Sequence, residues 1–348
     1  MSKFFSVRNR SFSYLISRKV VWVTLLLTVL LLVVAVISLS SGSLKIPPLD
    51  VLKVLLHIGN DSSHTVVINK LRLPRIVVAI LVGSSLAVSG AILQGMIRNP
   101  LASPDIVGIT GGATLGAVSF FYFFAGTVSI HLLPIGAILG AFVSTLLIYA
   151  MAWKRGVAPL RLVLIGIGMT AAFTALTYML LISAPYILAQ KSLTFMSGSI
   201  YGTSWAKDVV PLLPWTLILM PLAFLYTRHV NVQELGDDMA AGVGSRVQKH
   251  RLILLLISVA LAGAAVSIGG AITFIGLMAP HIARKLVGPA FGGVLPVSAL
   301  LGSLILLLAD WIGRTAFTPL DIPAGVFTAA VGAPFFVYLL YRHRHHHH

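Results

Sequence analysis

The sequence of 348 residues contains no cysteine, only nine acidic residues and few charged residues altogether. The absence of cysteine excludes disulfide bonds, thiolate metal ligands and a cysteine nucleophile. Charged residues make up 10% of the chain and hydrophobic residues 57%, whereas a soluble domain carries about a quarter charged residues. Together with a mean hydropathy of +0.97, this composition predicts an integral membrane protein.

The sequence also lacks the motifs of a catalytic or energy-converting site. No GxxxxGK[ST] phosphate-binding loop is present, and no two histidines outside the C-terminal run stand at the i, i+4 spacing of a metal site. No carboxylate lies in the middle of an apolar run, where a proton- or sodium-coupled carrier usually needs one. We therefore predict no metal, no cofactor and no enzyme activity, and an energy source on another subunit.

Long apolar runs are what the sequence does contain, and most approach the ~20 residues that cross a bilayer as a helix. The run 252–288 is divided in two because residues 252–281 in a single helix are too long for a ~30 Å core. The prediction is an all-α fold of ten transmembrane helices, at 20–39, 76–97, 105–125, 130–152, 160–184, 209–227, 252–271, 272–288, 294–312 and 323–341.

The basic residues set the orientation. The formal charge is +16, but the lysines and arginines are scattered singly between apolar runs, which argues against nucleic-acid binding. With the N-terminus in the cytoplasm, 17 of the 25 basic residues fall inside and 8 outside, in agreement with the positive-inside bias. Both termini are therefore predicted to be cytoplasmic. Residues 345–348 look like part of a histidine purification tag, which leaves 1–344 as a single domain.

Two patterns concern helix packing. Residues 81–108 align with residues 261–288, including Pro100 with Pro280, and the number of intervening spans is odd. This predicts an inverted internal repeat, which is common in solute transporters. Small residues also recur at a spacing of four, which predicts close approach of helix backbones; these are Gly108, Gly112, Gly116, Gly136 and Gly140.

Two polar features are candidates for contact with partners. The predicted cytoplasmic loop 228–251 holds a third of the acidic residues and predicts short helices for docking, with a solvated linker as the alternative. On the predicted outer side, Arg72 and Arg75 precede the second span and Arg314 follows the ninth. Arginines suit pairing with partner carboxylates. Lipid headgroups, or for Arg314 a salt bridge with Asp310, are the alternatives.

At these residues the sequence resembles the FecCD family of importer permeases, which carry ferric siderophores, haem and cobalamin. The resemblance extends over nearly the whole chain in the family's order. Its segments are LRLPR (71–75), LAVSGAILQGMIRNPLASPDIVGITGGATLG (86–116), ELGDDMAAGVGSRV (234–247), GAITFIGLMAPHIAR (270–284), LLLAD (306–310) and IPAGVFTAAVGAPFFVYLL (322–340).

The resemblance implies a bacterial cytoplasmic-membrane permease that works as a homo- or heterodimer with two ATPase subunits and an external binding protein. It implies docking of the binding protein on Arg72, Arg75 and Arg314, and a cytoplasmic gate at Ala158 and Pro159. It also implies an ATPase-coupling role for Glu234, Leu235, Gly236, Asp237, Asp238, Ala241, Gly242, Val243, Gly244, Arg246 and Val247. An iron–siderophore is the expected solute, with haem or cobalamin as the alternative solutes. The alternative function from another class is an ion-coupled secondary transporter.

Overall fold

The chain is helical along almost its whole described length. A computed structural model describes residues 4–9, 12–42, 44–58, 62–124, 126–154, 156–317 and 320–344, so the predicted tag lies outside the described residues. The helices are α1 (Arg18–Ser40), α2 (Pro48–Leu55), α3 (Ser62–Val66), α4 (Leu73–Ile97), α5 (Ile109–Phe124), α6 (Leu133–Ala152), α7 (Pro159–Ser183), α8 (Tyr186–Met196), α9 (Val210–Leu225), α10 (Thr227–Glu234), α11 (Asp237–Gly242), α12 (Val247–Gly269), α13 (Ile275–Val287), α14 (Phe291–Thr315) and α15 (Ala324–Arg344).

Three short segments have other helical forms, namely η1 (Val67–Arg72), η2 (Ile130–Leu132) and η3 (Trp205–Val209). A two-stranded hairpin, β1 (Phe4–Asn9) and β2 (Phe12–Ser17), precedes α1 with Phe4 paired to Ser17. The prediction of an all-α fold is confirmed, and this hairpin is a small addition before the first membrane helix. Aromatic and β-branched residues there favour extended structure, and two six-residue strands are too short to register as an apolar span.

Within the described residues, eight helices are long and apolar enough to cross a membrane. The two remaining predicted spans correspond to α5 and α13, with 16 and 13 residues. At 1.5 Å per residue these two helices extend about 24 Å and about 20 Å, which is less than a ~30 Å hydrocarbon core. The protein is thus a multi-pass helical membrane protein, and the count of ten complete spans stays a prediction.

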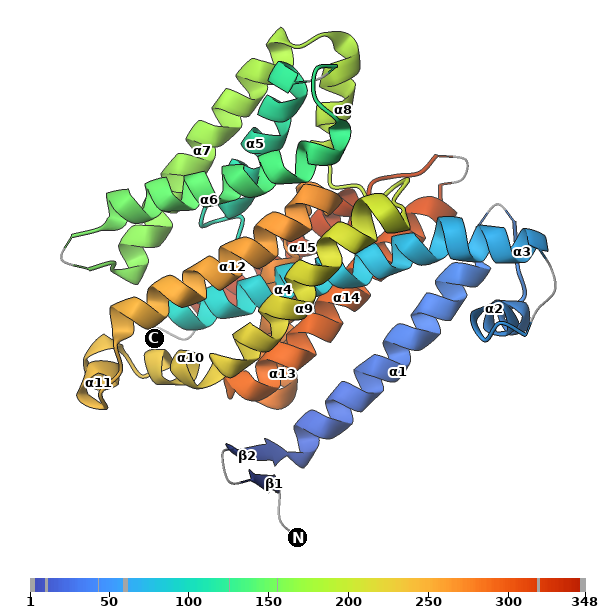
Figure 1. The fold of residues 1–348 in the computed structure, drawn as a ribbon. Helices are drawn as coiled ribbons and strands as arrows, with labels where there is room; N and C mark the ends of the chain where they lie inside the picture. Colours follow the sequence, from blue (N-terminus) through green and yellow to red (C-terminus); the bar gives the residue numbers. More distant parts are fainter. Residues whose placement is uncertain are drawn as a thin grey trace.

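Helix α4 lies at the centre of the bundle. It packs against α12, α13 and α14, and α1 lies against α14 at the edge (Figure 1). Helices α5 to α8 form a second group, in which α5 packs against α6 and α7, drawn in green at the top of Figure 1. Helix α12 also contacts α5 and α6, and so joins the two groups.

The predicted close approach of helix backbones at small residues is confirmed. A Cβ atom added to Gly116 would lie 2.3 Å from the carbonyl oxygen of Gly136, so α5 and α6 meet through their glycines. A Cβ atom added to Gly90 would lie 1.8 Å from the carbonyl oxygen of Gly276, where α4 crosses α13. Neither position admits a side chain without separation of the helices.

The inverted repeat is not seen between the two aligned segments. Residues 81–97 form the continuous second part of α4 and residues 98–108 follow outside any helix, whereas 261–288 contain a break at 270–274 and then α13. The break follows from Gly270, whose φ of +72° ends α12 and which lies so close to Phe195 that an added Cβ would approach its carbonyl oxygen to 2.3 Å. The two segments differ in secondary structure, so the inverted repeat is not confirmed and stays a prediction.

Candidate functional site

The predicted docking loop folds into a helical elbow, α10 followed by α11, at the lower left of Figure 1. Gly236 and Gly244 have φ values of +105° and +82°, and they bracket α11 with turns that side chains rarely adopt. Leu235, Met239 and Val243 stand four residues apart and are 62%, 64% and 66% exposed. An exposed apolar row next to polar loops indicates a surface that a partner covers.

The remaining predicted coupling residues divide into an exposed set and an anchored set. Asp238, Ala241, Gly242, Gly244 and Arg246 are exposed. A Cβ atom added to Gly242 would meet nothing within 4 Å. Glu234 lies at the root of the elbow, where burial raises the pKa of its carboxyl group and the charge of Arg284 partly offsets the rise.

One buried arginine anchors the elbow. Arg251, in the first turns of α12, is only 1% exposed and donates from Nη2 to Asp237 Oδ1 at 2.9 Å. Its Nη1 donates to the carbonyl oxygen of Val157 at 2.6 Å. Arg98, at the end of α4, reaches the same carboxylate of Asp237 at 3.3 Å.

The predicted gate residues lie directly beside this anchor. Ala158 is the N-cap of α7, and Pro159 is the first residue of that helix. Val157, which precedes them, accepts the bond from Arg251 and donates its N–H to Gln248 Oε1 at 3.2 Å. The structure thus brings together the coupling elbow and the predicted gate, two segments that the sequence analysis treated separately.

The three predicted docking arginines also come together, and all three have partners within the chain. Arg75 forms a bidentate pair with the buried Asp310, at 2.8 to 3.0 Å, and a second one with Asp321, at 2.7 and 2.8 Å. Arg72 and Arg314 converge on Gly42 in the connection between α1 and α2.

Arg72 donates to the carbonyl oxygens of Leu39 and Leu44, both at 2.5 Å. Arg314 donates to Ser41 O at 2.7 Å and to Ser38, and its Nε lies 3.9 Å from Asp310 Oδ2. The cluster therefore ties α4, α14 and the end of α1 together. Three arginines against two carboxylates leave one excess positive charge.

A cavity of about 190 Å³ opens between α5 and α7. Six threonines line it together with Asp105, namely Thr110, Thr114, Thr170, Thr174, Thr177 and Thr273. On α7 each hydroxyl donates at 2.8 Å to the carbonyl four residues earlier, so its oxygen lone pairs remain available to accept. Asp105 Oδ2 accepts one long bond, of 3.4 Å, from the N–H of Phe274.

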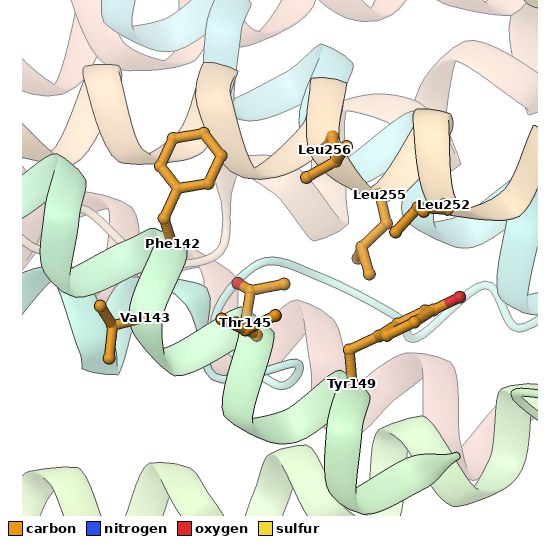
Figure 2. Close-up of a pocket in the computed structure, with 8 residues that line it drawn as sticks. Phe142, Val143, Thr145, Tyr149, Leu252, Leu255 and Leu256 are labelled. Atoms are coloured by element: carbon orange, nitrogen blue, oxygen red, sulfur yellow. The ribbon is translucent and has the colours of Figure 1, made fainter. Parts of the chain in front are cut away.

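A second cavity, of about 220 Å³, has only two polar side chains in its lining, Thr145 and Tyr149. Figure 2 shows it between α6 and α12, lined by Phe142, Val143, Thr145, Leu146, Tyr149, Leu252, Leu255 and Leu256. The Thr145 hydroxyl donates to the backbone of its own helix. Its apolar walls offer little to a polar solute, and the threonine cavity is therefore the better candidate for a solute site.

The sequence matches the FecCD transport family over residues 30–342. The chain belongs to this family. It is 47% identical to the achromobactin transport system permease protein of Dickeya dadantii, over 97% of this chain and 96% of that one. It is 42% identical to the iron(3+)-hydroxamate import system permease protein of Bacillus subtilis, over 89% and 94% of the two chains.

The three-dimensional fold agrees with this assignment. A solved structure of a metal-chelate type ABC transporter in an inward-facing conformation superposes with a TM-score of 0.82, at 30% identity. The match covers 92% of this chain and 99% of the other. The FecCD fold and the resemblance seen in the sequence therefore coincide, and the chain is a membrane permease of the ABC-importer type.

Sequence reasoning missed three features of this FecCD permease. Arg251 was counted only as one of many basic residues, because its partners Asp237 and Val157 lie far from it in the chain. The threonines of α7 did carry a signal, a spacing of four and three residues at 170, 174 and 177 that places them along one helix face. The carboxylates that hold Arg75 carried no comparable signal.

Proposed function

We propose that this chain is the transmembrane permease subunit of a binding-protein-dependent ABC importer for a ferric chelate, driven by ATP hydrolysis on partner subunits. The observation that carries the proposal is the 47% identity, over almost the full length of both chains, to a permease named for achromobactin transport. The relative named for iron(3+)-hydroxamate import supports the same class of solute. The chain itself supplies the pathway and no catalytic group.

The threonine cavity supports this function as part of the solute pathway. Four of the six hydroxyls, those of Thr114, Thr170, Thr174 and Thr177, already donate to backbone carbonyls, so they lie among the helices at little cost in unsatisfied hydrogen bonds. Because the α7 hydroxyls present acceptor lone pairs, the cavity suits the hydrogen-bond donors of a hydrated solute. Helix α7, which carries three of these threonines, begins at the predicted gate, Ala158 and Pro159.

A transport assay tests the function. The permease would be reconstituted in liposomes with its ATPase subunits and binding protein, and uptake of radiolabelled iron would be followed with ferric achromobactin and a ferric hydroxamate. We expect uptake to require ATP on the side of the membrane where the elbow lies. Uptake that follows a proton or sodium gradient without the ATPase would instead support a secondary transporter.

The pathway assignment predicts the effect of removing the hydroxyls. The triple variant Thr170→Val, Thr174→Val and Thr177→Val keeps the side-chain volumes and removes three hydrogen-bonding groups of about 0.5–1.5 kcal/mol each. We expect uptake to fall by about tenfold or more. The matched control is Thr216→Val in α9, whose hydroxyl also bonds the carbonyl four residues earlier. Equal uptake by both variants would contradict the assignment.

The proposed partners are a second permease subunit, identical or related to this one, and two ATPase subunits, which contact the permease at the elbow. A binding protein is proposed at the opposite end of the permease. The elbow then lies in the cytoplasm with both termini, in a bacterial cytoplasmic membrane. The exposed row of Leu235, Met239 and Val243 supports contact with a protein there, because these side chains lie between polar residues and not in an apolar span.

Binding-protein docking is proposed for the arginine cluster, where one positive charge remains in excess. Arg75 is held by two carboxylates, so the test uses Arg72, whose partners are backbone carbonyls. Arg72→Glu should weaken association with the binding protein. The difference in affinity from the unmodified permease should become smaller at higher salt, because salt screens charges over ~8–10 Å. A partner carboxylate changed to arginine should restore part of the affinity. If the reversal leaves affinity unchanged, Arg72 only closes the connection between α1 and α2.

A further inference from the structure

A single buried guanidinium joins the elbow to the start of α7. Arg251 Nη2 holds the carboxylate of Asp237 at the first residue of α11, and Nη1 holds the carbonyl of Val157 one residue before Ala158. Because the guanidinium is planar and rigid, its two ends move together. Gln248, one turn earlier on α12, holds the N–H of the same Val157.

The hydrogen bonding of Arg251 is incomplete. Its Nε atom is buried and has no hydrogen-bond partner, which is unfavourable for a buried donor. Asp237, by contrast, is partly exposed and shared with Arg98. Arg251 cannot reach water from its place under the elbow, so departure of Asp237 would leave a buried charge without its carboxylate partner. The pair is therefore expected to stay together when the elbow moves.

We propose that Arg251 is a positioning residue that transmits displacement of the elbow to the gate end of α7. When a partner moves α11, Asp237 pulls on Nη2, and Nη1 carries the displacement to Val157 and the first turn of α7. That helix carries Thr170, Thr174 and Thr177, so the movement reaches the wall of the threonine cavity. This inference rests on the proposed function and names the mechanical connection within it.

The test separates coupling from folding and from ATPase docking. The variant Arg251→Met keeps an unbranched buried side chain and removes both bonds, while the elbow's exposed surface stays intact. Since the chain has no cysteine, Ala158→Cys introduces one thiol for a spin label at the gate. The label's mobility would be recorded in the reconstituted complex, with and without ATP and vanadate.

We expect a nucleotide-dependent change of the label's spectrum in the unmodified complex and its loss with Arg251→Met. ATP hydrolysis should continue while uptake falls at least tenfold, and Arg251→Lys should recover part of both signals. The matched control is Arg98→Met, which removes the other arginine on Asp237 but touches no part of the gate. It should retain the spectral change.

Two results would overturn the inference. A nucleotide-dependent signal that persists in Arg251→Met shows that the gate moves by another route. Equal loss of the spectral change in Arg98→Met shows that gate movement depends on the position of Asp237 and not on the bond from Arg251 to Val157. Failure of the proposed function looks different, because the unmodified complex would then show neither ATP-dependent uptake nor a spectral change. A variant that fails to assemble is recognised by its missing ATPase, and Arg251→Gln, which also removes the guanidinium, then replaces Arg251→Met in the same comparison.

Discussion

Gly242→Trp is expected to abolish substrate-stimulated ATP hydrolysis and uptake while the subunit stays folded in the membrane. Gly242 ends α11 in the exposed part of the elbow, and a Cβ atom added there meets nothing within 4 Å. The indole therefore projects outward, next to the exposed Met239 and Val243, and blocks the surface proposed for the ATPase. Hydrolysis and uptake in proteoliposomes, with copurification of the ATPase, would be measured together.

A matched tryptophan on the other side of the molecule controls for the bulk of the indole. Thr127 is exposed in the connection between α5 and α6, away from the elbow. Thr127→Trp should leave assembly and uptake close to their original values. Normal uptake by Gly242→Trp at normal expression would remove the elbow from the coupling mechanism, whereas a folding defect would appear as loss of the monodisperse purified subunit.

Arg75→Ala is expected to destabilise the fold by about 3–5 kcal/mol, because Asp310 is only 2% exposed and loses its bidentate partner, keeping only Arg314 Nε at 3.9 Å. Asp321 loses the same partner but has more access to water. The loss would be measured as the shift in the free energy of unfolding during denaturant titration of the purified subunit. Uptake should fall with the amount of folded protein.

An exposed ion pair provides the comparison. Lys53 and Asp50 lie 2.9 Å apart on the surface of α2, and Lys53→Ala should cost no more than about 1 kcal/mol. The double variant Arg75→Met with Asp310→Leu should recover most of the lost stability, since it removes the buried charge together with its partner. If Arg75→Ala and Lys53→Ala cost the same, the buried pair does not stabilise the bundle.

Local sequence patterns determined much of this protein. Apolar runs located the membrane helices, since a bilayer requires about 20 apolar residues per span whatever the neighbouring helices are. Gly236, Gly242 and Gly244 predict short helices with breaks between them in loop 228–251. Gly236 and Gly244 do adopt positive φ, which glycine allows as a single residue, whereas Gly242 is the last residue of α11. Glycines at intervals of four predicted close helix packing, because that interval places them on one helix face.

Tertiary structure alone decided which distant groups meet. Asp310 lies 235 residues from Arg75, and the carbonyl of Val157 lies 94 residues from Arg251; no local periodicity relates either pair. The aligned segments 81–108 and 261–288 likewise share residues but not shape, because Gly270 breaks one helix against Phe195 while α4 continues. Periodicity reports the face of one helix, but a partner on another helix depends on how the whole bundle packs.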